Sequence, residues 1–233
     1  MNELASIPNR QAPPANEFID RFTAKALNDL MSMVTPISCP ANIVLFYEKA
    51  LPQRVFMIFE GRVKFSINSS DGKRLILRIA RKGEIVGIAS ALSGNPHEMT
   101  AETLCPTKLA PIGRREFLDF LLRHPEAYRT LTEELSREFS AACEQLRILG
   151  LSSTAPEKLA RLLLEWSENG QETESGTRFR LSLTHDEIGE YINASRETVT
   201  RAMKVFRNLR LVTFEGSTLT IPNKTALEIY ARS

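Results

Sequence analysis

Segment 184–211 constrains the fold of this 233-residue chain more than any other part of it. Thr184 and Glu187 have the spacing of a capping box, in which a threonine hydroxyl and a glutamate three residues later satisfy the first backbone N–H groups of a helix. The dipeptide 193–194, Asn-Ala, interrupts the pattern with a turn, and Ser195 can then cap a second helix. The segment therefore predicts two short helices joined by a tight turn.

Apolar residues recur along both predicted helices at intervals of three and four, as on the buried face of an amphipathic helix. The residues expected to be buried are Ile188, Tyr191 and Ile192 on the first helix, and Val199, Ala202, Met203, Phe206 and Leu209 on the second. The same register turns Arg196, Glu197, Thr200, Arg201 and Lys204 toward solvent.

The outward face has the chemistry that reads base pairs in the DNA major groove. Arginine can donate two hydrogen bonds to guanine, glutamate can accept one from cytosine, and each such contact contributes about 1–3 kcal/mol of discrimination. Arg196 and Arg201 are five residues apart, so both can enter one groove. Segment 194–213 holds five basic residues and one acidic residue, although the whole chain carries a net charge of only +2. A charged face is ordinary for a surface helix, but the caps, the turn and the register together favour a helix-turn-helix.

We therefore expect double-stranded DNA as the partner, bound through its phosphates as well as its bases. The residues expected at the interface are Thr184, Ser195, Arg196, Glu197, Thr198, Thr200, Arg201 and Lys204. Arg207 and Arg210 extend the basic side toward phosphates.

The composition is that of an ordinary globular protein, with 42% hydrophobic and 25% charged residues. The N-terminal residues lack the basic flank and apolar core of a signal peptide. Segment 30–47 is free of charge, but its prolines and polar residues exclude a membrane span. We expect a cytoplasmic protein that does not contact a membrane.

Segment 37–112 is rich in strand signals and follows a less regular N-terminal part. Residues 1–16 are rich in Pro, Asn and Ala and predict a flexible arm. A helix is expected at 17–33, with Leu27, Leu30 and Met31 on one face. Strands are expected at 55–59, 63–68 and 75–80. Short strands separated by Glu-Gly, Asp-Gly and Lys-Gly turns indicate a sandwich or barrel.

From residue 125 the pattern becomes helical. Apolar residues advance by three or four over some three heptads, as in a coiled-coil seam: Tyr128, Leu131, Leu135, Phe139, Ala142, Leu146 and Leu149. Such a helix either packs on its own domain or contacts a second subunit. We favour a subunit contact, and hence a homodimer, because the stripe is long and lies between two domains.

A further domain is expected to begin near 152–156, where the sequence Ser-Ser-Thr-Ala-Pro predicts a turn. The pattern then predicts a helix at 157–169, a polar loop at 169–177, a strand at 178–183 and, after the helix-turn-helix, a two-stranded wing at 211–221. The expected division is an arm at 1–16, a β-domain at 17–124, a dimerisation helix at 125–150 and a DNA-binding domain at 151–233.

The run Ser195–Arg201, S-R-E-T-V-T-R, resembles the recognition helix of the CRP/FNR superfamily of bacterial transcription regulators. The resemblance extends over nearly the whole chain. It implies an α+β fold with an N-terminal β-roll like a cyclic-nucleotide-binding jelly roll, a long dimerisation helix and a C-terminal winged helix-turn-helix. It also implies that Arg196, Glu197 and Arg201 contact bases in each half of a palindrome with TGTGA-like half-sites, and that the protein contacts RNA polymerase.

This chain departs from the cAMP-binding pattern of the family. The cAMP-binding version has a glutamate after the residue that matches Gly87, where Ile88 stands here. It has an arginine about ten residues later for the cyclic phosphate, but segment 82–113 contains no arginine. A buried phosphate without a cation is costly, so we expect no tight cAMP binding. The candidate effector pocket comprises Leu77, Gly87, Ile88, Ala89, Met99, Thr100 and Cys143.

An alternative function follows from the predicted interior of the roll. Leu77, Ile79, Ile85, Ile88 and Met99 could hold an apolar ligand, or could simply fill the interior. If these residues hold a ligand, the protein is a small-molecule sensor in which DNA binding is secondary.

Other sensors of the family fit no better. The iron–sulfur type needs an N-terminal cysteine cluster, but Cys39 is the only cysteine before residue 100. The haem type uses a histidine near the position of Ala89, and His97, in a loop beside proline, is expected to be solvated. We expect no cofactor and no metal. Cys39, Cys105 and Cys143 are expected to be buried, reduced thiols, with a redox sensor as the alternative.

The sequence contains no catalytic motif that we recognise: it has no Walker loop, no GxSxG, no HExxH and no zinc-deaminase pattern. We therefore do not expect an enzyme.

Overall fold

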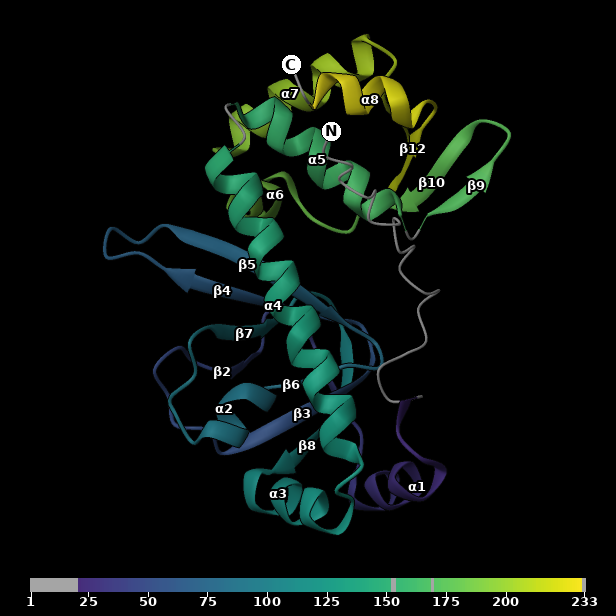
Figure 1. Ribbon diagram of the computed structural model, residues 1–233. Coiled ribbons are helices and arrows are strands. Elements are labelled where there is room, and N and C mark those ends of the chain that lie inside the picture. Colours follow the sequence, from purple (N-terminus) through teal and green to yellow (C-terminus); the bar gives the residue numbers. More distant parts are fainter. Residues whose placement is uncertain (1–20, 152–153, 169, 232–233) are drawn as a thin grey trace, which may run out of the picture.

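A computed structural model describes residues 21–151, 154–168 and 170–231. An N-terminal β-roll and a C-terminal helical domain are joined by the long helix α4 (Ala127–Leu151), as Figure 1 shows. The expected α+β architecture is confirmed. The arm predicted for 1–16 lies outside the described residues.

The β-roll consists of two four-stranded antiparallel sheets. Its strands are β1 (Ile37–Cys39), β2 (Val44–Phe46), β3 (Arg54–Glu60), β4 (Arg62–Asn68), β5 (Arg74–Arg81), β6 (Ile85–Val86), β7 (Thr100–Thr103) and β8 (Thr107–Gly113). One sheet has the order β1-β8-β3-β6 and the other β2-β7-β4-β5. The strands predicted at 55–59, 63–68 and 75–80 are confirmed as β3, β4 and β5.

A tight turn at Gly61 joins β3 to β4, which belong to different sheets. Gly61 has φ +90°, and a Cβ there would lie 2.5 Å from Thr107 Oγ1, so only glycine fits. The turn lets both strands contribute to one apolar core between the sheets, which includes Phe56, Ile58, Val63 and Phe65.

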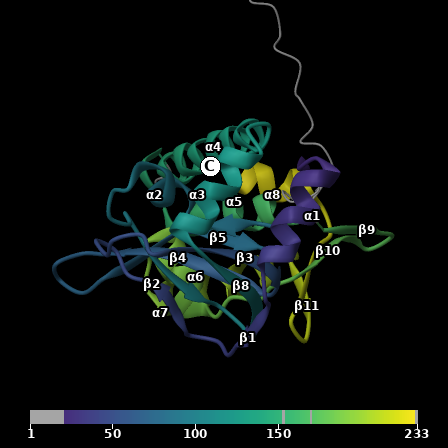
Figure 2. The same cartoon turned by 90° about the horizontal axis from the view of Figure 1, so that it is seen from below.

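A second apolar cluster lies outside the roll, where helices cover the sheet that contains β3. These helices are α1 (Ala24–Met33), α2 (Ile88–Ser93), α3 (Arg114–Arg123) and the first turns of α4. Seen from below, α4 runs along one side of the molecule, with the strands of the roll beneath it (Figure 2).

Several predicted apolar contacts of the roll are wrong. Ile85 and Ile88 belong to the outer helical cluster, because β6 and α2 turn them toward α1 and α3. Ile79 packs against the C-terminal domain instead of facing the interior. Met99 packs on the roll core, as expected. Leu77 is half-buried on β5.

The N-terminal helix begins later than predicted, at Ala24, after Thr23 caps it by accepting from the N–H of Ala26. Leu30 is buried and Leu27 is half-buried, as the pattern indicated. Met31 is exposed, so its assignment to the buried face is wrong. Ala26 fills that face instead, because it lies four residues before Leu30.

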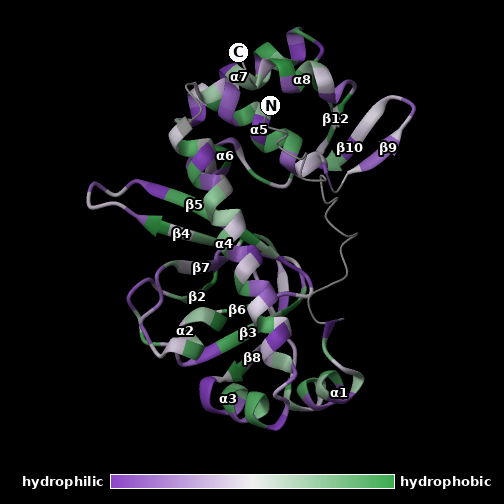
Figure 3. Ribbon diagram, viewed as in Figure 1, coloured by the Kyte–Doolittle hydropathy of each residue, from purple (hydrophilic) through white to green (hydrophobic). Residues whose placement is uncertain are grey.

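Helix α4 has two different parts. Its first turns pack on the roll, where Leu131 is buried and Leu135 half-buried. Further along, Phe139 and Leu146 are 71% and 67% exposed, and Ala142 between them is also exposed. Bands of hydrophobic residues recur along the helix in Figure 3. The predicted stripe therefore covers its own domain at one end and faces solvent in the single chain at the other.

The C-terminal domain packs four helices against a four-stranded sheet. Its elements are α5 (Ala155–Ser167), β9 (Gln171–Thr173), β10 (Gly176–Arg180), α6 (His185–Ile192), α7 (Arg196–Asn208), β11 (Thr213–Glu215), β12 (Thr218–Ile221) and α8 (Lys224–Tyr230). The sheet has the order β11-β12-β10-β9. The predicted wing is confirmed as β11 and β12.

Two predictions in this domain are wrong in detail. The polar loop expected at 169–177 contains β9 and the start of β10, which pair as a hairpin. The strand expected at 178–183 starts earlier and ends at Arg180. The hairpin was missed because β9, Gln-Glu-Thr, has no apolar alternation and is coloured hydrophilic in Figure 3.

Candidate nucleic-acid interface

The first helix of the helix-turn-helix begins with the predicted capping box. Thr184 Oγ1 accepts from the backbone N–H of Glu187 at 3.2 Å, and the Glu187 carboxylate accepts from the backbone N–H of Thr184 at 3.0 Å. The helix ends at Asn193, which adopts the left-handed conformation with φ 53°. The N–H of Ala194 then donates to the Gly189 carbonyl at 2.9 Å, which closes the turn.

The second helix, α7, has the predicted cap and most of the predicted register. Ser195 accepts from the backbone N–H of Thr198 at 3.2 Å. The buried side is confirmed for Val199, Ala202, Met203 and Phe206. Leu209 is 56% exposed, so its predicted burial is wrong. It follows the last helical residue, where the chain leaves the helical period.

The proposed DNA-contacting residues form one accessible face of α7 and its start. Ser195, Arg196, Glu197, Thr200, Arg201 and Lys204 are exposed, as is Thr184 on the first helix, and Thr198 is half-buried. Arg196 lies 3.7 Å from Asp186, a long and solvent-exposed ion pair, and Arg201 donates to Thr198 Oγ1 at 3.3 Å. Such exposed contacts are weak, so both guanidinium groups can exchange them for a ligand.

Glu197 is held in its ionised form at the start of α7. Its own backbone N–H and the Ser195 hydroxyl donate to the carboxylate, and Arg196 and Arg201 are nearby; together they lower the pKa of Glu197 below its ordinary value. An ionised carboxylate only accepts hydrogen bonds. Glu197 can therefore recognise a donor such as the amino group of cytosine.

A groove of about 680 Å³ separates α7 from the wing. It is lined by His185, Thr200, Met203, Lys204, Arg207, Asn208, Phe214 and Gly216. Lys204 and Arg207 lie on the accessible side of α7, as the sequence pattern predicted. His185 and Asn208 were not predicted here, although the capping box, which makes His185 the first residue of α6, could have indicated the former.

The helix-turn-helix is held against the β-roll by contacts that sequence patterns did not predict. Lys64 on β4 is only 4% exposed and lies 3.4 Å from both Glu102 on β7 and Glu187 on α6. Gln145 on α4 donates to the Tyr191 carbonyl at 2.7 Å. Ile76 on β5 belongs to the apolar core of the C-terminal domain. Among the side chains that the structure describes, these link α6 to three elements of the N-terminal part.

A second candidate site, a cavity of about 270 Å³, lies between the roll and α4. Of the predicted pocket residues, Gly87, Ile88, Ala89 and Met99 line it. Leu77, Thr100 and Cys143 do not line it, so their assignment to this pocket is wrong. Thr100 is buried beside it and accepts from the backbone N–H of Glu48 at 3.1 Å.

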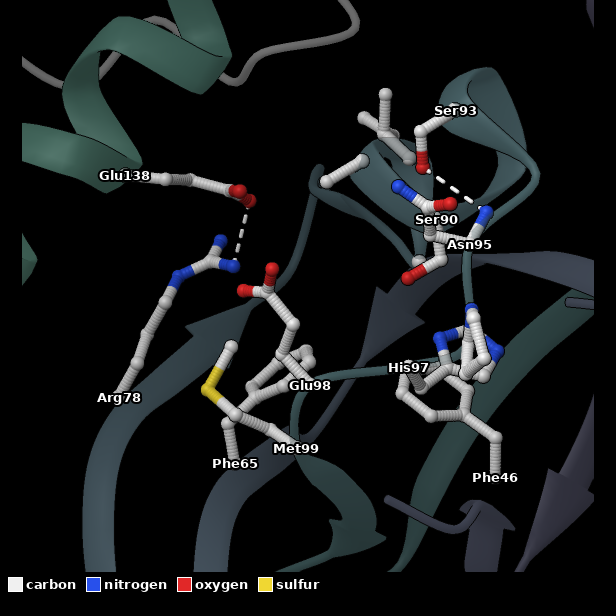
Figure 4. A pocket seen from close by; sticks show the side chains of 14 residues that line it. Phe46, Phe65, Arg78, Ser90, Ser93, Asn95, His97, Glu98, Met99 and Glu138 are labelled. Carbon is white, nitrogen blue, oxygen red and sulfur yellow. Dashed lines mark hydrogen bonds and ion pairs between the residues drawn. The ribbon is translucent and has the colours of Figure 1, made fainter. Parts of the chain in front are cut away.

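The cavity contains one guanidinium, that of Arg78, which the sequence analysis missed because Arg78 lies on β5 outside segment 82–113. Arg78 donates to Glu138 at 2.6 Å and also pairs with Glu84. Figure 4 shows Glu138 and Glu98 on either side of this guanidinium. Burial alone would lower the pKa of Arg78, but Glu84 and Glu138 raise it above its usual value. The guanidinium is therefore charged and already compensated.

His97 is buried in the cavity wall, so the expectation of a solvated ring is wrong. It is only 4% exposed and stacks on Phe46 with 3.7 Å between ring centroids. Its backbone N–H donates to the Ala50 carbonyl at 2.9 Å, and its carbonyl accepts from Lys49, which fixes the loop. Burial lowers the pKa of His97, which favours the neutral imidazole.

The three cysteines carry free thiols and are half-buried, less buried than expected. Across the described parts of the chain, no three His, Cys, Asp or Glu side chains are grouped as metal ligands would be. No helix in those parts is long and apolar enough to cross a membrane.

Comparisons with known proteins agree with this architecture. Residues 36–124 match the cyclic nucleotide-binding domain family, and residues 157–230 match the Crp-like helix-turn-helix domain family. A CRP-like cAMP-activated global transcriptional regulator of Mycobacterium tuberculosis is 26% identical over 208 residues, covering 89% of this chain and 92% of that protein. The transcriptional activatory protein AadR of Rhodopseudomonas palustris is 27% identical over 169 residues, covering 72% of this chain and 69% of that protein.

Solved structures share the same fold. FixK2 from Bradyrhizobium japonicum has a TM-score of 0.74 at 23% identity, covering 84% of this chain and 96% of that one. A CooA mutant from Carboxydothermus hydrogenoformans has a TM-score of 0.76 at 17% identity, covering 91% of this chain and 96% of that one. With a nucleotide-binding-type roll, a Crp-like helix-turn-helix and regulators as relatives along most of its length, the chain belongs to the CRP/FNR family of DNA-binding transcription regulators.

Proposed function

We propose that this protein is a homodimeric, sequence-specific transcription regulator that binds a palindrome with TGTGA-like half-sites. The observation that carries the proposal is the exposed face of α7, where Arg196, Glu197 and Arg201 project from one capped helix. These three side chains are the proposed base readers. Thr184, Ser195, Thr198, Thr200 and Lys204 surround them and are proposed to contact the sugar–phosphate backbone or flanking bases.

The homodimer is proposed from the exposed stripe on α4. Phe139, Ala142 and Leu146 present apolar surface at helical spacing, as a helix does when it packs against a second copy of itself. A twofold pairing of these helices would duplicate α7. Two copies would then enter successive major grooves about 34 Å apart, which matches a palindromic site.

Regulation by cAMP is not part of the proposal. The relative from Mycobacterium tuberculosis is named for activation by cAMP, but here Ile88 and His97 stand in the cavity near the positions of the usual glutamate and arginine. Arg78 cannot replace the missing cation without leaving Glu84 and Glu138 unpaired. Glu98 and Glu138 would in addition repel a phosphate.

Selection of genomic DNA with the purified full-length protein tests the proposal. We expect one inverted repeat to be enriched equally with and without cAMP. In the Arg196→Ala and Arg201→Ala variants, preference for that repeat should fall while weak nonspecific binding persists. Selection of no common sequence would contradict the proposed function, and enrichment only with cAMP would contradict its independence of cAMP.

The cavity supports a second candidate function, that of a sensor for an unidentified small molecule. Its volume of about 270 Å³ is enough for a small ligand, and the buried His97 ring lines it. A thermal-shift screen with metabolites tests this. A compound that raises the melting temperature without changing DNA affinity would favour a sensor role separate from DNA binding.

Transcription activation is a further part of the proposal that needs contact with RNA polymerase. The turn at 69–73 is exposed, as are Glu174 and Ser175 in the turn between β9 and β10, and both turns are candidate contact surfaces. Pull-down of RNA polymerase by the DNA-bound protein, compared with variants in each segment, tests which one is used.

A further inference from the structure

His185 lies where the two helices of the helix-turn-helix meet, and its hydrogen bond fixes where its ring carries a proton. Nδ1 of His185 is 2.8 Å from Thr200 Oγ1. The Thr200 hydroxyl has a single proton, which it donates to the Arg196 carbonyl at 2.9 Å. The same oxygen can therefore only accept from His185. In this arrangement Nδ1 is the donor to Thr200, and Nε2 is the ring nitrogen left for a further partner.

The surroundings of His185 suit an anion. His185 lines the groove between α7 and the wing together with Lys204 and Arg207. Among the described residues that line this groove, none has a carboxylate. A neutral Nε2 presents a lone pair, which repels a phosphate oxygen, whereas a protonated Nε2 donates a charge-assisted hydrogen bond to it.

We propose that His185 binds a phosphate of the DNA backbone, and that this contact takes up one proton per protomer. The proposal rests on the proposed DNA-binding function and adds a dependence on pH to it. Lys204 and Arg207 line the same groove, so a protonated His185 adds a third positive charge there, which a phosphate would compensate. DNA should therefore bring the proton with it.

The acidic groups nearest to this groove are already engaged. Asp186, the next residue in the chain, lies 3.7 Å from Arg196. Glu215, at the tip of the wing, pairs with Arg178 at 2.8 Å. Glu187, one turn along α6 at its other side, serves the capping box and Lys64. None of these pairs involves the His185 ring, so a phosphate is the anion best placed to compensate it.

The test compares DNA affinity between pH about 6 and about 8, the range in which histidine changes charge, at constant ionic strength. Full-length wild type, His185→Gln and His185→Arg are titrated with the selected palindrome and with a scrambled duplex of equal length. Wild-type affinity for both duplexes should rise as the pH falls, by roughly tenfold per pH unit per protomer at most. His185→Gln should be weaker and less dependent on pH, and His185→Arg tight and equally insensitive.

Equal pH dependence in wild type and His185→Gln would overturn the inference, as would a flat wild-type profile. Because phosphates are common to both duplexes, this readout is independent of sequence preference. Equal binding of the palindrome and the scrambled duplex would instead count against the proposed function alone.

A measurement without DNA tests the hydrogen-bond argument itself. The chain has three histidines, so nitrogen NMR of selectively labelled protein can resolve each ring, with His185→Gln assigning the signal. Neutral His185 should carry its proton on Nδ1. In Thr200→Val, which keeps the shape but removes the acceptor, that preference should disappear. A neutral ring protonated on Nε2 in the wild type would overturn the inference.

Discussion

Single residues set the geometry of the helix-turn-helix. Gly189 lies under the turn, and a Cβ at this position would be 2.5 Å from the Ala194 carbonyl oxygen. The close approach is what allows the N–H of Ala194 to donate to the Gly189 carbonyl. The turn therefore depends on a missing side chain, which hydrophobic patterns cannot reveal.

Replacement of Gly189 by alanine should destabilise the protein by about 1–3 kcal/mol, the usual effect of overpacking. Backbone must shift to remove the clash, so DNA affinity should fall as well. Urea denaturation measures the first effect. Gly150→Ala is the matched control, because no atom of the described residues lies within 4 Å of a Cβ there and alanine favours a helix by about 1 kcal/mol. Equal stability of the two variants would contradict the account.

Glu190 is a residue whose charge opposes the fold. Its Oε2 is buried and has no hydrogen-bond partner among the residues that the structure describes. Burial raises the pKa of Glu190 above its ordinary value, although Arg74 and Lys64 act in the opposite direction. Because the folded state then holds the proton more tightly, Glu190 favours folding at acidic pH, and this contribution is lost as the pH rises through the raised pKa.

Glu190→Gln should therefore stabilise the protein at pH about 8 by roughly 1 kcal/mol and have little effect at pH about 4. Urea midpoints measured across this range test the prediction. Glu168→Gln, at an exposed position, serves as the control and should be neutral throughout. If Glu190→Gln is as stable as wild type at every pH, the buried Glu190 carboxylate does not destabilise the folded state.

At the scale of elements, sequence patterns identified the helices and strands that are determined by residues close together in the sequence. A run of β-branched and aromatic residues predicted β3, alternation predicted β4, and the capping residues Thr184 and Ser195 predicted where α6 and α7 begin. The sequence patterns failed where the partner is distant. Ile76 and Ile79 look like any strand residues, but they pack on the other domain.

The junction between β4 and α6 is the element-scale feature most open to test. Lys64→Met removes the cation shared by the buried Glu102, which keeps its contact with Arg74 at 3.4 Å, and by the half-buried Glu187. Removing one partner of a buried ion pair typically costs about 3–5 kcal/mol. We expect a loss of this order in urea denaturation, with the two domains unfolding separately. Lys73 lies on the exposed turn between β4 and β5, so the control Lys73→Met should leave the free energy of unfolding unchanged. A single unchanged transition for Lys64→Met would contradict the role of the junction.

At the scale of the whole molecule, the arrangement connects the cavity to the reading helix. Helix α4 contributes Glu138 to the cavity and Gln145 to the contact with α6, and the same part of the helix carries the exposed apolar stripe. One helix thus takes part in the cavity, the proposed dimer contact and the docking of the C-terminal domain. A ligand or a substitution at one of these places can affect the other two only if it stabilises one position of α4 more than another.

Phe139→Glu should convert the proposed dimer to a monomer, because a charge replaces the largest apolar side chain of the exposed stripe. Light scattering coupled to size-exclusion chromatography gives the mass directly. Leu122→Glu, on α3, replaces an equally exposed leucine outside the stripe and should leave the dimer intact. A wild type that is monomeric, or a Phe139→Glu variant that remains dimeric, would place the subunit contact elsewhere.

The most direct test of the central claim is the ratio of affinities for the selected palindrome and a scrambled duplex, measured by competition. Arg201→Ala should reduce the difference in binding free energy between the two duplexes by about 1–3 kcal/mol for each half-site. Binding to the scrambled duplex should be nearly unchanged. Arg115→Ala, an exposed arginine on α3, should leave both affinities unchanged. If Arg201→Ala retains the full wild-type ratio, α7 does not read the bases and the account is wrong.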